Sequence, residues 1–208
     1  MALAAGADQG AWSSPVPLFD GRTLTGWKAT RNPDGWTVED GQIVCLALKG
    51  GYLYTEEQYE DFVLDLEFKI GPNANSGVFL RLSDISDPVN TGIEVQILDD
   101  ASHPHVKPTQ LCGALYDMVP PSRPAMRPLG EWNHMRVTCR GPHISVELNG
   151  AAVSAMNVDE FSVPGRNPDG TPNKFKYAWK EMPRRGHIAL QDHNSKVWFR
   201  NITVRLPR

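Results

Sequence analysis

Alternation between apolar and polar residues is the feature that most constrains this 208-residue chain. It recurs in short segments separated by turn-forming residues, at intervals of roughly ten residues, which is the pattern of half-buried β-strands. No window of 11 residues shows the three-and-four spacing of an amphipathic helix, although Glu56–Glu60 could form a single helical turn. The 18 glycines and 17 prolines fit a chain of many short strands, because both residues concentrate in turns. The pattern therefore predicts an all-β sandwich or barrel.

The predicted strands include two hairpins, one around the turn at 39–41 and one around the turn at 140–142. The predicted strand segments are 36–46 (a hairpin), 61–70, 78–83, 92–98, 132–139, 143–148, 151–154, 186–191 and 197–206. Two long connections, 99–131 and 156–185, interrupt this rhythm. Loops of that length in a compact domain are usually functional or disordered, and their aromatic residues favour packed, functional loops.

Charge and hydropathy argue against two classes of function. The chain has 21 Lys and Arg against 24 Asp and Glu, a net charge of −3, and a pI of about 6.1. A nucleic-acid binder usually carries a basic face, so no nucleic-acid partner is expected. No apolar run approaches the ~18 residues of a membrane helix, so no membrane span is expected. The three cysteines lack metal-type spacing and are predicted to be small buried residues.

Polar residues interrupt the outward faces of three predicted strands. They are a carboxylate, a guanidinium, two amides and an imidazole: Glu94, Arg81, Gln96, Gln191 and His193. Each one alone is most simply a solvated residue on an exposed sheet. Together they are hydrogen-bonding groups of the kind that hold hydroxyl-rich ligands, and His193 can exchange a proton near neutral pH. If the three strands are neighbours, the five side chains share one surface.

Residues of the long loops give further candidates. His103 and His105 are expected at the surface, but with Asp99 and Asp100 they could form a cation site. Trp179 and Tyr116 are candidates for stacking on a sugar face. Three other tryptophans are predicted to lie in the core: Trp27, Trp36 and Trp198.

An ordered series of short motifs resembles the 3-keto-disaccharide hydrolase family over about residues 17–206. Each motif is weak alone, and their order is specific. The motifs are Leu18-Phe19-Asp20-Gly21 with Gly26-Trp27, Val38-Glu39-Asp40-Gly41, Tyr59-Glu60-Asp61-Phe62 with Glu67, Asn75-Ser76-Gly77, Glu94-Val95-Gln96-Ile97-Leu98-Asp99, Gly113-Ala114-Leu115-Tyr116, Gly130-Glu131-Trp132-Asn133, Leu148-Asn149-Gly150, Leu190-Gln191-Asp192-His193 and Phe199-Arg200-Asn201-Ile202. The chain departs from the family pattern at Asn194-Ser195-Lys196, which replaces a shorter turn.

The resemblance implies a concanavalin A-like jelly roll, that is, a sandwich of two antiparallel sheets with long proline-rich loops. It would form one domain over 17–208, after an N-terminal tail at 1–16. It also implies cleavage of glycosides whose sugar is already oxidised to a ketone at C3, and some family members use a divalent metal. An upstream sugar 3-dehydrogenase would then supply the substrate. The short N-terminus lacks the features of a secretory signal, and a periplasmic or secreted protein with its signal removed is the expected context.

A ketone at C3 acidifies the proton on C2, so a base can start β-elimination of the group on C1, and water then adds across the C1=C2 bond. The steps need a base, an electrophile for the enolate oxygen and an acid for the leaving group. His193 or Glu94 is predicted to be the base, with the other as acid. Arg81 or a bound cation would stabilise the enolate. The residues expected to bind substrate are Gln96, Gln191, Asn75, Tyr116, Trp179 and Asp99.

Two alternatives stay open. Laminarinase-type glucanases carry E-x-D-x-x-E on one concave strand, whereas this chain has Glu94, Gln96 and Asp99 at those positions. Direct retaining hydrolysis needs two carboxyl groups about 5–5.5 Å apart, and an amide at the centre cannot tune its neighbours as a charge would. The other alternative is a non-catalytic carbohydrate-binding module, since concave sheets with amides and aromatic residues also bind sugars without reacting.

Overall fold

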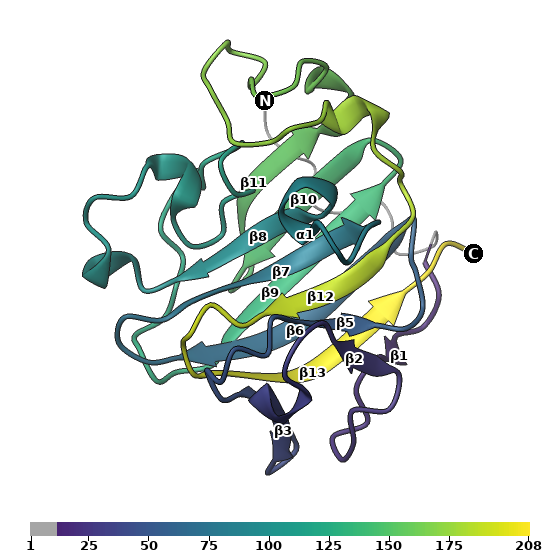
Figure 1. Ribbon diagram of the computed structural model, residues 1–208, viewed down its shortest axis with the longest axis vertical. Helices are drawn as coiled ribbons and strands as arrows, with labels where there is room; N and C mark the ends of the chain where they lie inside the picture. Colours follow the sequence, from purple (N-terminus) through teal and green to yellow (C-terminus); the bar gives the residue numbers. More distant parts are fainter. Residues whose placement is uncertain (1–11) are drawn as a thin grey trace.

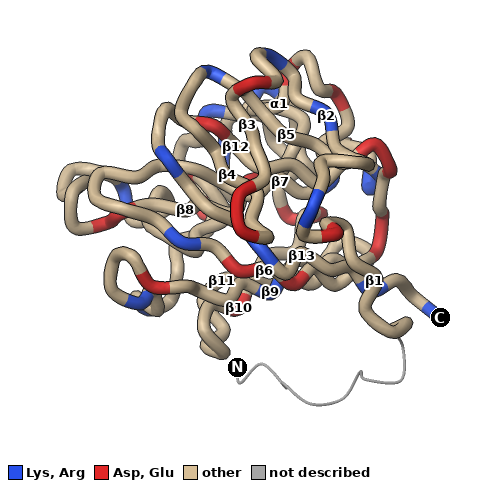
Figure 2. Tube along the Cα trace, turned by 90° about the horizontal axis from the view of Figure 1, so that it is seen from below, with Lys and Arg blue, Asp and Glu red and all other residues tan. Residues whose placement is uncertain are grey.

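Two antiparallel sheets pack face to face in the computed structural model, which describes residues 12–208 (Figure 1). The larger sheet has the order β11-β10-β9-β6-β13-β4-β3, with β1 also paired to β13, and the smaller has the order β2-β5-β12-β7-β8. Figure 2 shows the two layers edge on, with β2, β5, β7 and β12 above β6, β9, β10 and β13. This is the predicted jelly-roll sandwich.

The strands are β1 (Val16–Pro17), β2 (Trp27–Ala29), β3 (Trp36–Glu39), β4 (Gln42–Cys45), β5 (Tyr52–Thr55), β6 (Phe62–Ile70), β7 (Asn75–Leu82), β8 (Ile93–Leu98), β9 (Asn133–Arg140), β10 (His143–Leu148), β11 (Ala151–Asn157), β12 (His187–Gln191) and β13 (Val197–Arg205). The helical elements are one short α-helix, α1 (Pro88–Thr91), and the 3₁₀ turns η1 (Pro33–Gly35), η2 (Asp100–Ser102), η3 (Pro108–Gln110), η4 (Val158–Glu160) and η5 (Trp179–Glu181).

The core lies between the sheets and is built from the alternating residues. Phe62, Leu64, Leu66 and Phe68 of β6 are each at most 1% exposed, which confirms the predicted inward face. Each predicted strand segment contains an observed strand. The helical turn predicted at 56–60 is wrong, because Tyr59 instead pairs with Gly186 through reciprocal backbone hydrogen bonds.

Two strands of the smaller sheet, β2 and β5, were not predicted from the sequence. β5 is only four residues long, and its alternation of Tyr52 and Tyr54 with buried Leu53 and Thr55 is brief. β2 is three residues long and pairs with β5. Such short segments carry little periodic signal.

The cysteines and tryptophans test the predicted core. Cys45, Cys112 and Cys139 are free and buried, as expected. Trp27 and Trp36 are buried too. Trp198 is only partly buried, so its assignment to the core is wrong. It lies on the outer face of the larger sheet, where Lys69 Nζ is 4.8 Å from its ring centroid.

The fold includes residues that the sequence assigns to the tail. Trp12 is 8% exposed and pairs with Pro207, and β1 begins at Val16. The rest of the predicted tail, 1–11, lies outside the described residues. Over 12–208, no helix has the length and apolarity that crossing a membrane would need.

Both long connections flank the smaller sheet (Figure 1). Residues 113–116 of the first extend it beyond β8, because Tyr116 N donates to Glu94 O (2.9 Å) and Gly113 N donates to Gln96 O (2.9 Å). The second connection carries η4 and η5, which contact each other. These loops therefore form walls beside the outer face of the smaller sheet.

A bulge in β7 reverses the side of the sheet that Arg81 faces. Arg81 has a φ of 51°, in the left-handed region, and the pairing of β12 with β7 shifts between His187 and Ala189. The guanidinium donates to Glu60 O (2.8 Å), Gly141 O (2.8 Å) and Asp61 Oδ1 (3.1 Å). The prediction that Arg81 lies on the outward face of its strand is therefore wrong, because a single bulge shifts the alternation by one residue.

Gly186 permits the chain to pass close to this bulge. A Cβ on Gly186 would lie 2.3 Å from the Arg81 carbonyl carbon, a backbone atom that cannot easily move. We expect Gly186→Ala to lower the free energy of unfolding by about 1–3 kcal/mol, measured by denaturant titration. Gly71→Ala is the matched control, since no atom lies within 4 Å of its added Cβ. Equal stability of the two variants would contradict this account of the bulge.

Candidate active site

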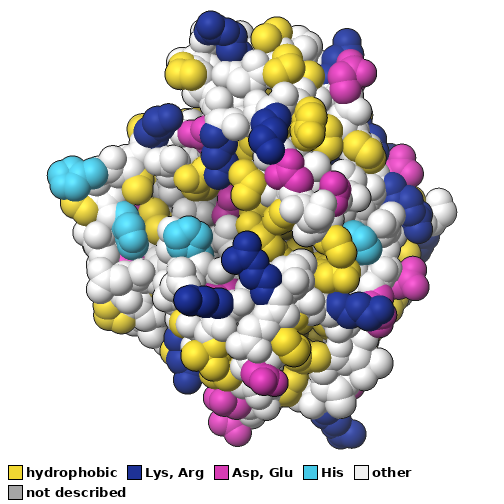
Figure 3. Space-filling model, in the orientation of Figure 1, with side chains coloured by type: hydrophobic (Ala, Val, Ile, Leu, Met, Phe, Trp, Pro, Cys, Tyr) yellow, Lys and Arg dark blue, Asp and Glu magenta, His cyan; other side chains and the backbone are white. Residues whose placement is uncertain are grey.

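The outer face of the smaller sheet brings together polar and aromatic residues from β5, β7, β8 and β12. Gln191 pairs with Tyr52, Gly77 with Gln96, and Phe79 with Glu94. Because side chains directly opposite in neighbouring strands point to the same side, these residues form one surface. Figure 3 views this face, where acidic, basic, histidine and hydrophobic side chains all occur.

Glu94 is the centre of this surface. It is 7% exposed, and its side chain lies across Gly77, where an added Cβ would be 2.4 Å from Glu94 Oε1. In the amide orientation that satisfies its neighbours, Gln96 Nε2 donates to Ser76 O (3.0 Å) and to Glu94 Oε1 (3.2 Å). Burial raises the pKa of Glu94 to about 7, against a smaller opposing effect of Lys174. A carboxyl group with this pKa exchanges protons readily at neutral pH.

Lys174, in the second long connection, supplies a positive charge on the β8 side. Its backbone N donates to Asp117 Oδ2 (2.9 Å), which fixes the chain at this point. Its Nζ lies 4.0 Å from the ring centroid of Tyr116. Burial lowers the pKa of Lys174, while the negative charges of Glu94 and Asp117 act in the opposite direction.

Tyr52 and Gln191 form the opposite side of the surface. The Tyr52 ring packs edge-on against Phe79, with centroids 4.9 Å apart, and Gln191 Nε2 donates to the Tyr52 hydroxyl (3.4 Å). Gln191 Oε1 is buried with no hydrogen-bond partner among the described residues. A buried acceptor without a donor costs free energy, so this atom is available to a ligand hydroxyl.

Several predicted residues lie at the margins of this surface. Asn75 is half-buried beside Gln96, and its backbone N donates to Ser195 Oγ (3.0 Å). His193 is exposed in the turn between β12 and β13, two residues beyond Gln191. Tyr116 is half-buried, and its hydroxyl accepts from Gln110 Nε2 (3.0 Å).

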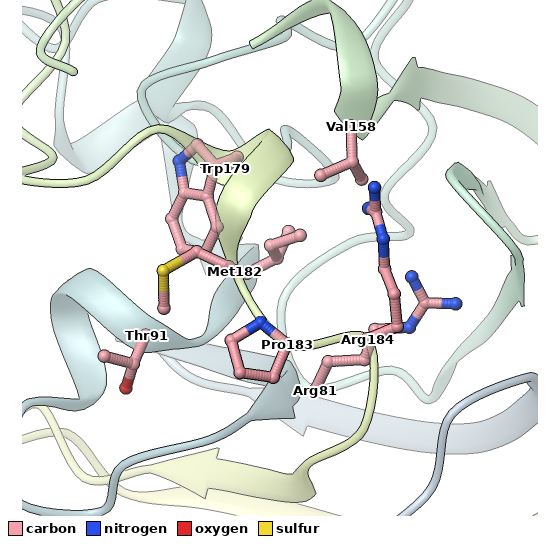
Figure 4. A pocket seen from close by; sticks show the side chains of 8 residues that line it. Arg81, Thr91, Val158, Trp179, Met182, Pro183 and Arg184 are labelled. Carbon is pink, nitrogen blue, oxygen red and sulfur yellow. The ribbon is translucent and has the colours of Figure 1, made fainter. Parts of the chain in front are cut away.

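Arg81 and Trp179 do not reach this surface. Both line a different cavity of about 10 Å³, which has room for one water molecule and not for a sugar. Figure 4 shows the two side chains there with Met182 and Pro183. Trp179 is 2% exposed and packs edge-on against Phe175 (4.9 Å). The prediction that Trp179 stacks on a sugar is therefore wrong, because neither ring face is accessible.

Asp99 is used within its own loop. Its carboxylate accepts from Ser102 Oγ (2.5 Å) and Asn73 N (2.9 Å), and Asp100 Oδ1 accepts from Cys112 N (2.8 Å). Through these bonds, Asp99 holds the end of β8 in place. Its contact with substrate stays a prediction. In the described part of the chain, no three His, Cys, Asp or Glu side chains gather to hold a metal. The divalent metal that the family resemblance implies, including a site at His103, therefore stays a prediction.

Tyr52, Phe79 and Lys174 were not predicted as site residues. The alternation in Tyr52-Leu53-Tyr54 was the available signal for the first. Phe79 lies in the strand predicted at 78–83, and an apolar residue there gives no sign that it borders a site. Lys174 lies in a loop without periodicity, so only the length of that loop pointed to it.

Comparison with known proteins identifies the family. Residues 14–205 match the sequence model of the family described as a 3-keto-alpha-glucoside-1,2-lyase-like domain. The chain belongs to this family. A 3-keto-disaccharide hydrolase of Bacteroides thetaiotaomicron is 26% identical over 236 residues, which cover 92% of this chain and 78% of that protein. Family membership places the chain among enzymes that cleave glycosides.

Solved structures support the same architecture. A proposed glycosyl hydrolase of Parabacteroides distasonis is 36% identical, with a TM-score of 0.85, over 93% of this chain and 99% of its own. A second protein of that description from the same organism is 27% identical, with a TM-score of 0.77, over 92% and 93% of the two chains. The kappa-carrageenase of Pseudoalteromonas carrageenovora, at 9% identity and a TM-score of 0.57 over 99% of both chains, shares the fold alone.

The raised pKa of Glu94 predicts a pH-dependent stability. The folded protein holds this proton up to about pH 7, whereas the unfolded chain releases it near 4.5. The contribution of this group to the free energy of unfolding is therefore complete below pH 4.5. It falls by about 3 kcal/mol as the pH rises toward 7. We expect Glu94→Gln to remove this fall in denaturant titrations across that range. If the free energies of unfolding of the variant and the wild type differed by the same amount at all pH values, the raised pKa of Glu94 would be contradicted.

The contact between Gly77 and Glu94 predicts a second effect. Gly77→Ala forces the end of a flexible side chain to move, so the fold should persist while the carboxylate is displaced. We expect at least a tenfold loss in kcat, since small misplacements of reacting groups are costly, with a melting temperature close to that of the control Gly71→Ala. Wild-type kcat in Gly77→Ala would show that the position of the carboxylate does not matter.

Proposed function

We propose that the protein cleaves 3-keto-glycosides by β-elimination followed by hydration. The observation that carries the proposal is Glu94, a buried carboxyl group with a pKa of about 7 on a face lined by hydrogen-bonding side chains. The family description, a 3-keto-alpha-glucoside lyase, and the printed name of the Bacteroides relative support the same substrate class.

In the first step, the Glu94 carboxylate removes the proton from C2 of the sugar. The electron pair moves to the C3 carbonyl and forms an enolate, whose negative oxygen is stabilised by the Lys174 ammonium. Lys174 takes the role first given to Arg81, because it is the cation whose charge acts on Glu94. Lys174 is an exposed residue, and a positive charge held beside the developing enolate oxygen stabilises its negative charge.

In the second step, the enolate returns its electron pair, a C1=C2 double bond forms, and the bond from C1 to the leaving oxygen breaks. The leaving oxygen takes a proton from protonated Glu94 or from His193. Water then adds, with its hydroxyl going to C1 and a proton to C2, which yields the free 3-keto sugar. Gln96, Gln191, Asn75 and Tyr116 hold the sugar hydroxyls. No step is routed through a metal.

The structure favours this proposal over direct hydrolysis. The second carboxylate of a laminarinase-type pair would be Asp99, and its Oδ2 already accepts hydrogen bonds from Ser102 Oγ and Asn73 N within its own loop. A carbohydrate-binding module without activity would not need a carboxyl group that titrates near neutral pH. The ketone would come from a separate sugar 3-dehydrogenase, and a periplasmic or secreted location stays a prediction.

The decisive experiment compares methyl glucoside with methyl 3-keto-glucoside in deuterated water. We expect turnover of the keto form alone, with one deuterium at C2 of the product. Glu94→Gln and Lys174→Met should each lower kcat by at least 10²-fold, and His193→Ala should lower it less, because Glu94 can also protonate the leaving group. Lys180→Met is the control for Lys174→Met, since Lys180 is exposed in η5.

Cleavage of the unoxidised glucoside without deuterium at C2 would contradict the proposal and support direct hydrolysis. Binding of either sugar without turnover would support a binding module. A parallel assay with chelator tests the expected metal separately.

A further inference from the structure

We infer that a pocket beside Tyr52 binds the leaving group of the substrate, and that the leaving group is a single hexose-sized, hydroxyl-rich unit. This inference rests on the proposed function. The pocket has a volume of about 200 Å³ and is lined by Thr30, Arg31, Tyr52, Ile85, Ser86 and Pro88. It is smaller than the ~300–1,000 Å³ of sites for drug-sized ligands, which suits one sugar ring.

Tyr52 connects this pocket with the catalytic surface. Its ring contacts Phe79, and its hydroxyl accepts from Gln191. The pKa of Tyr52 is raised by burial and is affected in opposite directions by the charges of Glu94 and Arg31. The charges of the Glu94 carboxylate and the Arg31 guanidinium therefore both act on the tyrosine hydroxyl.

Arg31 is the polar group that the pocket offers to a ligand. The residue before it is fixed to β5, because Thr30 N donates to Tyr52 O (2.9 Å) and Thr30 Oγ1 accepts from Tyr52 N (3.0 Å). The stem of Arg31 lies against Gly51, where an added Cβ would be 3.0 Å from Arg31 Cγ. Over residues 12–208, the Arg31 guanidinium makes no hydrogen bond or ion pair, so its donors are available to sugar hydroxyls.

Apolar residues at the start of α1 and in the connection before it complete the pocket. Ile85, which is 40% exposed, and Pro88, the first residue of α1, both line it. Sugar rings carry hydroxyl groups at their edges and C–H groups on their faces. A guanidinium with an apolar wall is therefore suited to a sugar ring.

The geometry of the reaction places the leaving group on this side. C1 and C3 are the two ring neighbours of C2, so they lie on opposite sides of the proton that Glu94 removes. Lys174 lies over Tyr116, which pairs with β8 on the side away from β7, and Lys174 would hold the C3 oxygen. C1 then points across β7 and β12 toward β5. Three strand spacings separate β8 from β5, roughly 14 Å at ~4.8 Å each, so a unit attached to C1 extends toward the Tyr52 pocket.

The test compares a 3-keto-disaccharide with methyl 3-keto-glucoside, whose leaving group is too small to enter the pocket. Arg31→Met should lower kcat/KM for the disaccharide about tenfold, the usual cost of a lost hydrogen bond to a charged group, and leave the methyl glycoside within about twofold. Ile85→Trp, at an exposed position, should fill the pocket with the same selective effect. Arg22→Met, at an exposed arginine outside the pocket, is the control.

Equal losses on both substrates, or no loss on either, would overturn the inference. Failure of the wild type on the methyl glycoside would instead count against the proposed function. Calorimetric binding of the unoxidised sugars then still tests the pocket. Arg31→Met should weaken the binding of the disaccharide and leave the binding of methyl glucoside unchanged. Equal affinities of the variant and the wild type for the disaccharide would overturn the inference.

Discussion

The burial of one carboxyl group under the outer face of the smaller sheet is the interaction on which the site depends. Taking a carboxylate out of water costs free energy, and the protein tolerates Glu94 there by raising its pKa to about 7. Three features make the burial possible. Gly77 leaves space for the side chain across the strand pair, Gln96 donates to it, and Lys174 supplies a positive charge from a distant loop.

The two sheets and the two long connections together make the burial of Glu94 possible. The larger sheet and the inward face of the smaller one form a continuous apolar core, so the outer face of the smaller sheet can carry polar residues at no cost to packing. The two long connections raise walls at its sides. One adds backbone hydrogen bonds along β8, and the other brings Lys174 over Tyr116. Residues far apart in the sequence thereby enclose a single surface.

The sequence was sufficient for the sheet architecture and for the centre of the site. Period-two alternation identified β6, β7, β8 and β12, and the outward positions of Glu94, Gln96 and Gln191 followed from it. The same rule failed at Arg81, because a bulge with a left-handed residue shifts the alternation and no single residue type announces it. The prediction for Trp179 failed for another reason, because the burial of an aromatic residue in a long loop depends on contacts with segments distant in sequence. The signals for Tyr52 and Lys174, a brief alternation and a long loop, are too weak to place either residue at the site without the strand order.

The central claim is that Glu94 holds its proton up to neutral pH. The most direct measurement is the carboxyl-carbon chemical shift of Glu94 in protein labelled with ¹³C at the glutamate side chain, assigned with Glu94→Gln and followed from pH 4 to pH 9. The account predicts a titration midpoint near 7. A midpoint near 4.5, the ordinary value for glutamate, would contradict it.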